Sequence, residues 1–200
     1  MGRIKIIVVL FLLQANTSIK SQIKPSFYQP SLLRSSATIA PTRFYNQNTT
    51  VAFINGFLEY VLEQHISVRG EGNIMVPNAL LLMSLDPERF PRNCGSLYAG
   101  FGYHLGKNNW KFDILAEPGV LITELSQDPG LTVPVTYKWS VNPSYMLKLG
   151  TTYYFSRYCH FFAELNYGDA WARRTPMTSL SLAHYGISAG LGFHILTKRN

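Results

Sequence analysis

Hydrophobic and polar side chains alternate along several short segments of the chain, most clearly over residues 184–195. Every odd position in this segment is Tyr, Ile, Ala, Leu or Phe, and every even position is Gly, Ser or His. A period of two over twelve residues predicts a β-strand whose two faces meet different environments. The apolar face suits hydrocarbon, and the small polar face suits the narrow interior of a barrel.

The same period recurs upstream and predicts seven further strands. The first of them alternates weakly and is interpreted as an edge or closing strand. Pro118-Gly119 is expected to bend the fifth. The seven segments are 32–42, 50–62, 65–76, 97–105, 110–122, 145–155 and 160–167.

The connections between these strands alternate in length. Tight turns are expected near residues 63, 107 and 157, and a loop is expected near residue 45. Longer connections rich in Pro, Gly and charge are predicted at 77–93, 123–136 and 168–178, with a short turn of helix at 79–83. Outer-membrane barrels place short turns in the periplasm and long loops outside. The prediction is an all-β, eight-stranded antiparallel up-and-down transmembrane barrel over residues 32–197, with both termini in the periplasm.

Residues 1–21 have the layout of a secretory signal peptide. A basic start is followed by an apolar run at 6–13 and by small polar residues. Cleavage is expected before Gln22, with cleavage after Ala15 or Ser18 as alternatives. The run is too short to span a bilayer.

The remaining sequence is consistent with one exported domain. Residues 22–31 contain two prolines beside Phe27 and Tyr28, which predicts an irregular periplasmic entry segment before the barrel. The chain has 200 residues and a formal charge of +7, but its basic residues are scattered, so nucleic-acid binding is not expected. No later apolar run is long enough for a transmembrane helix. The expected location is the outer membrane of a Gram-negative bacterium.

Four strand motifs carry a resemblance to a known family: Gly56-Phe-Leu-Glu-Tyr60, Ser67-Val-Arg-Gly-Glu71, Leu149-Gly-Thr-Thr-Tyr-Tyr154 and Ala189-Gly-Leu-Gly-Phe193. Over residues 50–196 the chain resembles the small eight-stranded outer-membrane β-barrel proteins of bacteria. The resemblance implies a structural or adhesion-related role and specifies architecture better than function. Family members often end on an aromatic residue, whereas Phe193 is followed here by seven more residues.

Periodicity alone leaves open which face is inside, and a soluble lipocalin-like barrel around an apolar ligand is the alternative. Two features favour the membrane barrel. Glycines gather at the alternate strand positions that carry polar residues, here called the polar parity, where a crowded lumen needs small residues: Gly100, Gly102, Gly150, Gly186, Gly190 and Gly192. Aromatic residues gather near strand ends, as interfacial girdles require: Tyr103, Trp110, Phe155 and Phe193 on the periplasmic side, and Trp139, Tyr167, Trp171 and Tyr185 outside.

The polar parity also carries charges of both signs. Buried charges must form ion pairs or contact water. A lumen filled by salt bridges is therefore expected, and a narrow path for ions or protons is the alternative. The predicted charge network consists of Glu59, Arg69, Glu71, Lys111, Asp113, Glu117, Lys148 and Glu164.

Four histidines are predicted at the periplasmic end: His65, His104, His160 and His194. They are weak candidates for a transition-metal site, because no Cys or carboxylate completes a recognised ligand spacing. Rim polarity is the simpler interpretation. No cofactor is expected.

Fragments of hydrolase chemistry are present. His184 and Ser188 share a face, which resembles the His–Ser pairing of barrel lipid A deacylases, although the residue spacing differs. Glu164 is the nearest acid, but no complete triad is evident and catalysis is not expected. Cys94 and Cys159 are predicted at opposite ends of the barrel, too far apart for a disulfide.

The predicted function is an integral outer-membrane barrel with a filled polar lumen, in a structural role or one mediated by its loops. Expected partners are outer-membrane lipids, lipopolysaccharide and an extracellular partner. Arginines that could meet lipopolysaccharide phosphates are Arg89, Arg92, Arg173 and Arg174. The protein is expected to be a monomer.

Overall fold

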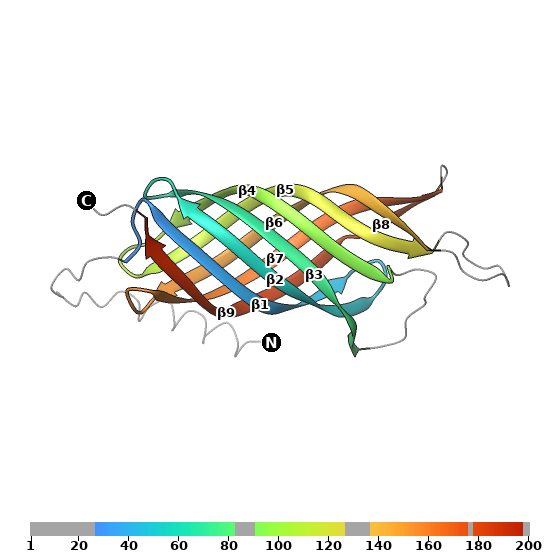
Figure 1. Cartoon of the computed structure of the whole chain (residues 1–200), viewed down its shortest axis with the longest axis horizontal. Helices are drawn as coiled ribbons and strands as arrows, with labels where there is room; N and C mark the ends of the chain where they lie inside the picture. Colours follow the sequence, from blue (N-terminus) through green and yellow to red (C-terminus); the bar gives the residue numbers. More distant parts are fainter. Residues whose placement is uncertain (1–26, 83–90, 127–136, 176–177, 198–200) are drawn as a thin grey trace, which may run out of the picture.

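A computed structural model describes residues 27–82, 91–126, 137–175 and 178–197, and these residues form one closed antiparallel β-barrel (Figure 1). The predicted signal peptide, residues 1–21, lies outside the described residues. Among the described residues, none forms a helix with the length and hydropathy needed to cross a membrane.

Within the described ranges, nine strands make up the wall of the barrel. They are β1 (Leu32–Phe44), β2 (Thr49–Val61), β3 (Ile66–Leu82), β4 (Asn93–Leu105), β5 (Trp110–Ser126), β6 (Tyr137–Tyr154), β7 (Cys159–Thr175), β8 (Thr178–Ser181) and β9 (His184–Leu196). Both β8 and β9 pair with β7, at successive positions along it. Together they occupy one position around the wall, so the barrel has eight such positions, here called staves.

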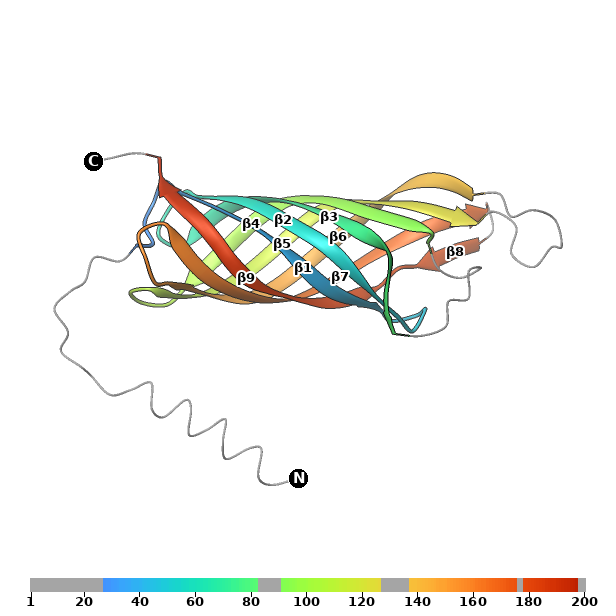
Figure 2. The ribbon, with the colours of Figure 1, turned by 60° about the horizontal axis from the view of Figure 1, so that its bottom comes forward.

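Each stave pairs antiparallel with the next, and the last closes on the first through the β1–β9 pairing (Figures 1 and 2). The eight-stranded up-and-down barrel predicted from the sequence is therefore confirmed. Residues 62–65, 106–109 and 155–158 are tight turns at one end, here called the turn end, which lies on the left in Figure 1. Residues 45–48 and the β7–β8 hairpin lie at the other, the loop end.

Two local predictions were wrong. Residues 79–82 belong to β3 and are not helical, while residue 83 lies outside the described residues. Pro77 is tolerated there because β3 pairs with β4 only as far as Ile74, which leaves this stretch as an edge. The connection predicted at 168–178 is largely strand, because β7 continues to Thr175 and pairs with β8.

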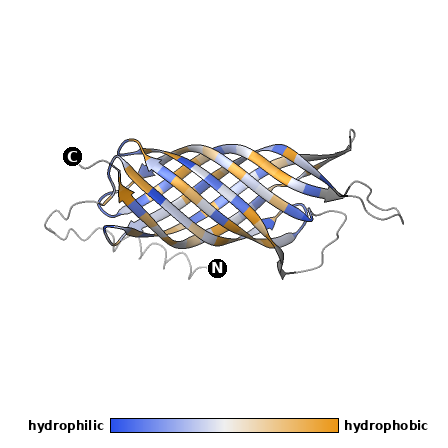
Figure 3. Ribbon diagram, in the orientation of Figure 1, coloured by the Kyte–Doolittle hydropathy of each residue, from blue (hydrophilic) through white to orange (hydrophobic). Residues whose placement is uncertain are grey.

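The two faces of the strands meet different surroundings. In β9, Ile187 is 55 % exposed on the outer face, whereas Ser188 is 1 % exposed in the lumen. Figure 3 shows hydrophobic and hydrophilic residues interspersed along the strands of the wall. The alternative of a soluble barrel with an apolar interior is therefore excluded, since the apolar parity faces outward.

The lumen is layered along its axis. An apolar layer fills the loop end and consists of Phe44, Val51, Phe53, Met75, Cys94, Leu121, Ala170 and Leu182. Leu182 reaches this layer because the eighth stave breaks between β8 and β9, where the Leu182 N–H donates to the Ala170 carbonyl at 2.8 Å. A second apolar layer fills the turn end and consists of Tyr28, Leu32, Val61 and Tyr154.

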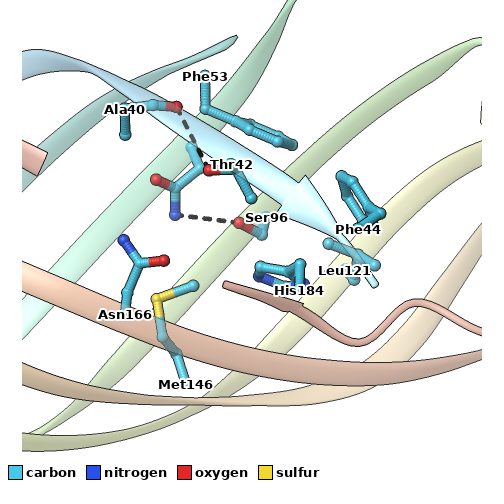
Figure 4. Close-up of a pocket in the computed structure, with 10 residues that line it drawn as sticks. Ala40, Thr42, Phe44, Phe53, Ser96, Leu121, Met146, Asn166 and His184 are labelled. Carbon is cyan, nitrogen blue, oxygen red and sulfur yellow. Dashed lines mark hydrogen bonds between the residues drawn. The ribbon is translucent and has the colours of Figure 1, made fainter. Parts of the chain in front are cut away.

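Charged and polar residues occupy the space between these layers. Directly below the loop-end layer is a cavity of about 20 Å³, with room for about one water molecule. Figure 4 shows Thr42, Asn166 and His184 among the residues that line it.

The seam between β1 and β9, where the barrel closes, has an interrupted ladder. Its ladder is formed from Leu32 to Ser36 and from Thr42 to Phe44, but not over residues 37–41. Pro41 lies in this gap and has no N–H to donate. Two hydroxyl groups partly replace the ladder, because Thr38 Oγ1 donates to the Ala189 carbonyl at 2.8 Å and Ser36 Oγ donates to the Leu191 carbonyl at 3.3 Å.

This gap predicts a residue-specific pattern of amide exchange. The Ala189 and Leu191 carbonyls face β1, so their N–H groups face the gap, whereas Ser188 and Gly190 direct theirs toward the complete β7 ladder. In detergent micelles, NMR is expected to show Ala189 and Leu191 exchanging at least about tenfold faster than Ser188 and Gly190. Equal protection of the four amides would contradict the weak seam.

Candidate functional site

The centre of the lumen is organised around the guanidinium of Arg69 on β3. Its Nη1 and Nη2 donate to the two carboxylate oxygens of Glu164 on β7, at 2.6 and 2.9 Å, and Nη2 also donates to Glu71 at 2.8 Å. The Phe57 ring centroid lies 3.7 Å from its Cζ. This contact gives Phe57 a reason to interrupt the polar parity of β2, because an aromatic face attracts a cation.

Lys148 on β6 reaches the same group of carboxylates. Its ammonium donates to Glu71 and lies 3.7 Å from both Glu117 and Glu164. Arg69 and Lys148 therefore join β3, β5, β6 and β7 across the lumen. All of these side chains are almost completely buried.

A second group of ion pairs surrounds Arg34 on β1. Its Nη2 lies 2.7 Å from Glu59 and 3.2 Å from Asp113, and its Nη1 donates to Tyr154 Oη at 3.0 Å. Arg34 is fully buried but was not among the predicted network residues. Arg34 lies between Leu33 and Ser35, on the opposite face of the first strand. This position could have identified it as a lumen residue, but the alternation of hydrophobic and polar residues in that strand is weak.

His104 on β4 bridges the two carboxylates that bind Arg34. Its Nδ1 lies 2.6 Å from Asp113, while its Nε2 lies 2.9 Å from Glu59 and 2.7 Å from Ser67 Oγ. A proton on each ring nitrogen would give both carboxylates a cationic partner. This residue, predicted as part of a rim, lies inside the barrel.

Two predicted members of the network differ from the rest. Lys111 donates to the Gly106 carbonyl at 3.0 Å, and its ammonium lies 4.6 Å from the Tyr28 ring centroid, so it contributes to the turn-end mouth. Glu117 accepts no hydrogen bond from any described residue at either carboxylate oxygen; its nearest cationic atom is Arg69 Nε at 3.6 Å. It is the least well paired carboxylate of the group.

The four turn-end histidines do not converge. His160 and His194 face each other with 3.2 Å between their Nδ1 atoms, and Tyr28 and Tyr154 lie between this pair and His104. His65 is exposed and contacts the His104 carbonyl. Within the described part of the chain, no three His, Cys, Asp or Glu side chains are arranged to hold a metal ion.

The hydrolase fragments are not assembled either. His184 Nδ1 is hydrogen bonded to the Leu182 carbonyl at 2.9 Å, and Glu164 is held by Arg69. Ser188 Oγ is buried and has no hydrogen-bond partner among the described residues. These contacts provide no general base for a serine nucleophile.

The two cysteines are free. Cys94 is the second residue of β4, near the loop end, and Cys159 begins β7 at the turn end.

The predicted interfacial aromatics all lie exposed on the outer surface. Those assigned to the periplasmic side lie near the turn end of their strands or in a turn: Tyr103, Trp110, Phe155 and Phe193. Those assigned to the outside lie on the loop-end half of β6, β7 and β9: Trp139, Tyr167, Trp171 and Tyr185.

Comparison with solved structures finds the same architecture. Neisserial surface protein A is 9 % identical with a TM-score of 0.59, over 82 % of this chain and 96 % of that one. OprG from Pseudomonas aeruginosa is 9 % identical with a TM-score of 0.53, over 84 % and 97 %. The N-terminal β-barrel domain of Pseudomonas aeruginosa OprF is 11 % identical with a TM-score of 0.51, over 84 % and 100 %.

No family model matches the chain, and no curated protein matches its sequence. At these identities the solved structures establish the fold alone. The chain thus has the fold of the small eight-stranded outer-membrane β-barrels. Its apolar outer face is that of a transmembrane barrel.

The unequal pairing of the carboxylates predicts a difference between two chemically identical substitutions. Glu164→Gln removes a charge that accepts two bonds from Arg69, so it is expected to lower the free energy of unfolding by about 2 to 4 kcal/mol. Glu117→Gln removes a buried charge without a hydrogen bond and is expected to change it by less than about 1 kcal/mol. Urea unfolding in lipid vesicles measures both, and a larger loss for Glu117→Gln would contradict the pairing described.

Proposed function

We propose that this protein is a closed outer-membrane scaffold that acts through its loop end rather than through its lumen. The observation that supports this most strongly is the layered interior, in which the paired charges lie between two apolar layers. A conducting pore needs continuous water, and an eight-stranded barrel has room for little beyond its own side chains.

The loop end offers more surface than the turn end. β3, β5, β6 and β7 contain 17 or 18 residues, whereas β1, β2, β4 and β9 contain 13. Because the turns at the other end are tight, the additional length extends toward the loop end (Figure 2). By the usual orientation of bacterial barrels, this end faces the exterior.

The expected ligand class at the loop end is the phosphate groups of lipopolysaccharide. Arg173 and Arg174 lie at the end of β7, where Arg173 pairs with Ser179 of β8. On the same strand, Trp171 is exposed on the outer face. Guanidinium groups bind phosphate through charge-assisted hydrogen bonds, and an exposed Trp suits the membrane interface.

A matched pair of double variants tests this function. Arg173→Ala with Arg174→Ala removes two charges at the loop end, and Lys107→Ala with Arg157→Ala removes two exposed charges at the turn end. Binding of purified lipopolysaccharide to the protein in detergent micelles is expected to weaken about tenfold in the first variant only, since two charge-assisted contacts are lost. Equal affinities in both variants would count against a loop-end lipopolysaccharide site.

A further inference from the structure

Residues 27–31 cross the mouth of the barrel at the turn end before β1 begins. Ser31 fixes this segment: its N–H donates to the Val61 carbonyl at 2.8 Å, and its own carbonyl accepts from Thr197 N at 3.0 Å and Thr197 Oγ1 at 2.9 Å. Ser31 has a φ of 68°, in the left-handed region that non-glycine residues seldom adopt. The chain therefore turns sharply at Ser31, and Tyr28 enters the barrel.

The Tyr28 side chain is 5 % exposed and fills the mouth. Its ring centroid lies 5.4 Å from that of His104 and 5.7 Å from that of Tyr154. The Lys111 ammonium lies 4.6 Å from the same ring, within the range of a cation–π contact. Burial raises the pKa of the Tyr28 hydroxyl far above its ordinary value, so the ring is neutral in the mouth.

The two ends of the lumen are closed by unequal barriers. At the loop end, eight apolar side chains contributed by several strands form the layer. At the turn end, the Tyr28 ring makes a tilted contact with the ring of His104, which is bonded to Asp113. Residues 27–30 precede the anchor at Ser31 and belong to no strand, so they can leave the mouth by pivoting at Ser31 while its hydrogen bonds to Val61 and Thr197 stay in place.

We propose that residues 27–31 are a strap whose Tyr28 ring plugs the lumen at the turn end, and that release of the strap opens the His104–Asp113 pair to water on that side. Release of the strap exposes this buried acid–base pair to water from one side of the membrane only. The loop-end layer stays closed, so the released state is a water-filled pocket and not a channel.

Thiol accessibility tests this proposal. In a Cys159→Ser background, Ser67→Cys places a thiol beside His104, and Ser96→Cys places a matched thiol in the loop-end half of the lumen. A water-soluble cationic thiol reagent is added to the folded protein in micelles, and labelling is followed by mass spectrometry. Adding Tyr28→Ala is expected to speed labelling of Ser67→Cys at least about tenfold and to leave Ser96→Cys unlabelled.

Two results would overturn the strap: equal labelling of Ser67→Cys with and without Tyr28→Ala, or labelling of both thiols when Tyr28 is replaced. Heat-modifiable gel mobility checks that each variant is folded. If Tyr28→Ala does not fold, Tyr28→Leu keeps apolar contact with the turn-end layer and is expected to give an intermediate labelling rate. A rate equal to that of the parent would then reject the proposal.

Discussion

In hydrocarbon, every backbone N–H and carbonyl must find a partner within the protein, and this requirement closes the sheet on itself. Closure with eight strands leaves an interior only wide enough for side chains. Every second residue of each strand is therefore packed into a crowded lumen, and the others face lipid. Crowding explains why small residues occur at lumen-facing positions. A Cβ on Gly192 would lie 2.3 Å from His160 Nε2, and one on Gly102 would lie 2.5 Å from Ser67 Oγ.

The crowded lumen also determines how its charges behave. Arg69 is fully buried, so its charge must be satisfied by Glu164, Glu71 and the face of Phe57. Because these partners come from different strands, the ion pairs hold opposite walls together. The protein thus has a polar core and an apolar surface, and two apolar layers separate the core from water at the ends.

Much of this architecture could be predicted from the sequence. A period of two is present in nearly every strand because lipid restricts the residues of the outer face and the lumen restricts those of the inner face. The alternation of tight turns with long connections indicated the topology. Strand ends at the loop end were less predictable. There the β7–β8 hairpin leaves the barrel ladder and the end of β3 has no β4 partner, so a Pro or a charge no longer excludes a strand.

The site was predictable where parity was clear and missed where it was not. Glu59, Arg69 and Lys148 lie on strongly alternating strands, and the structure places them in the interior. Arg34 lies on the weakly alternating first strand, and Tyr28 lies in a segment with no periodicity. Their roles depend on partners more than 70 residues away, such as Asp113 and His104, which only the closed fold brings close.

The two apolar layers close the lumen at both ends. Single-channel recording of the purified, heat-modifiable protein in planar bilayers tests this closure directly, at low and high salt and at both polarities. A closed lumen predicts a silent trace at every voltage below that which breaks the bilayer. Discrete, reproducible openings whose size grows with salt concentration would contradict the account.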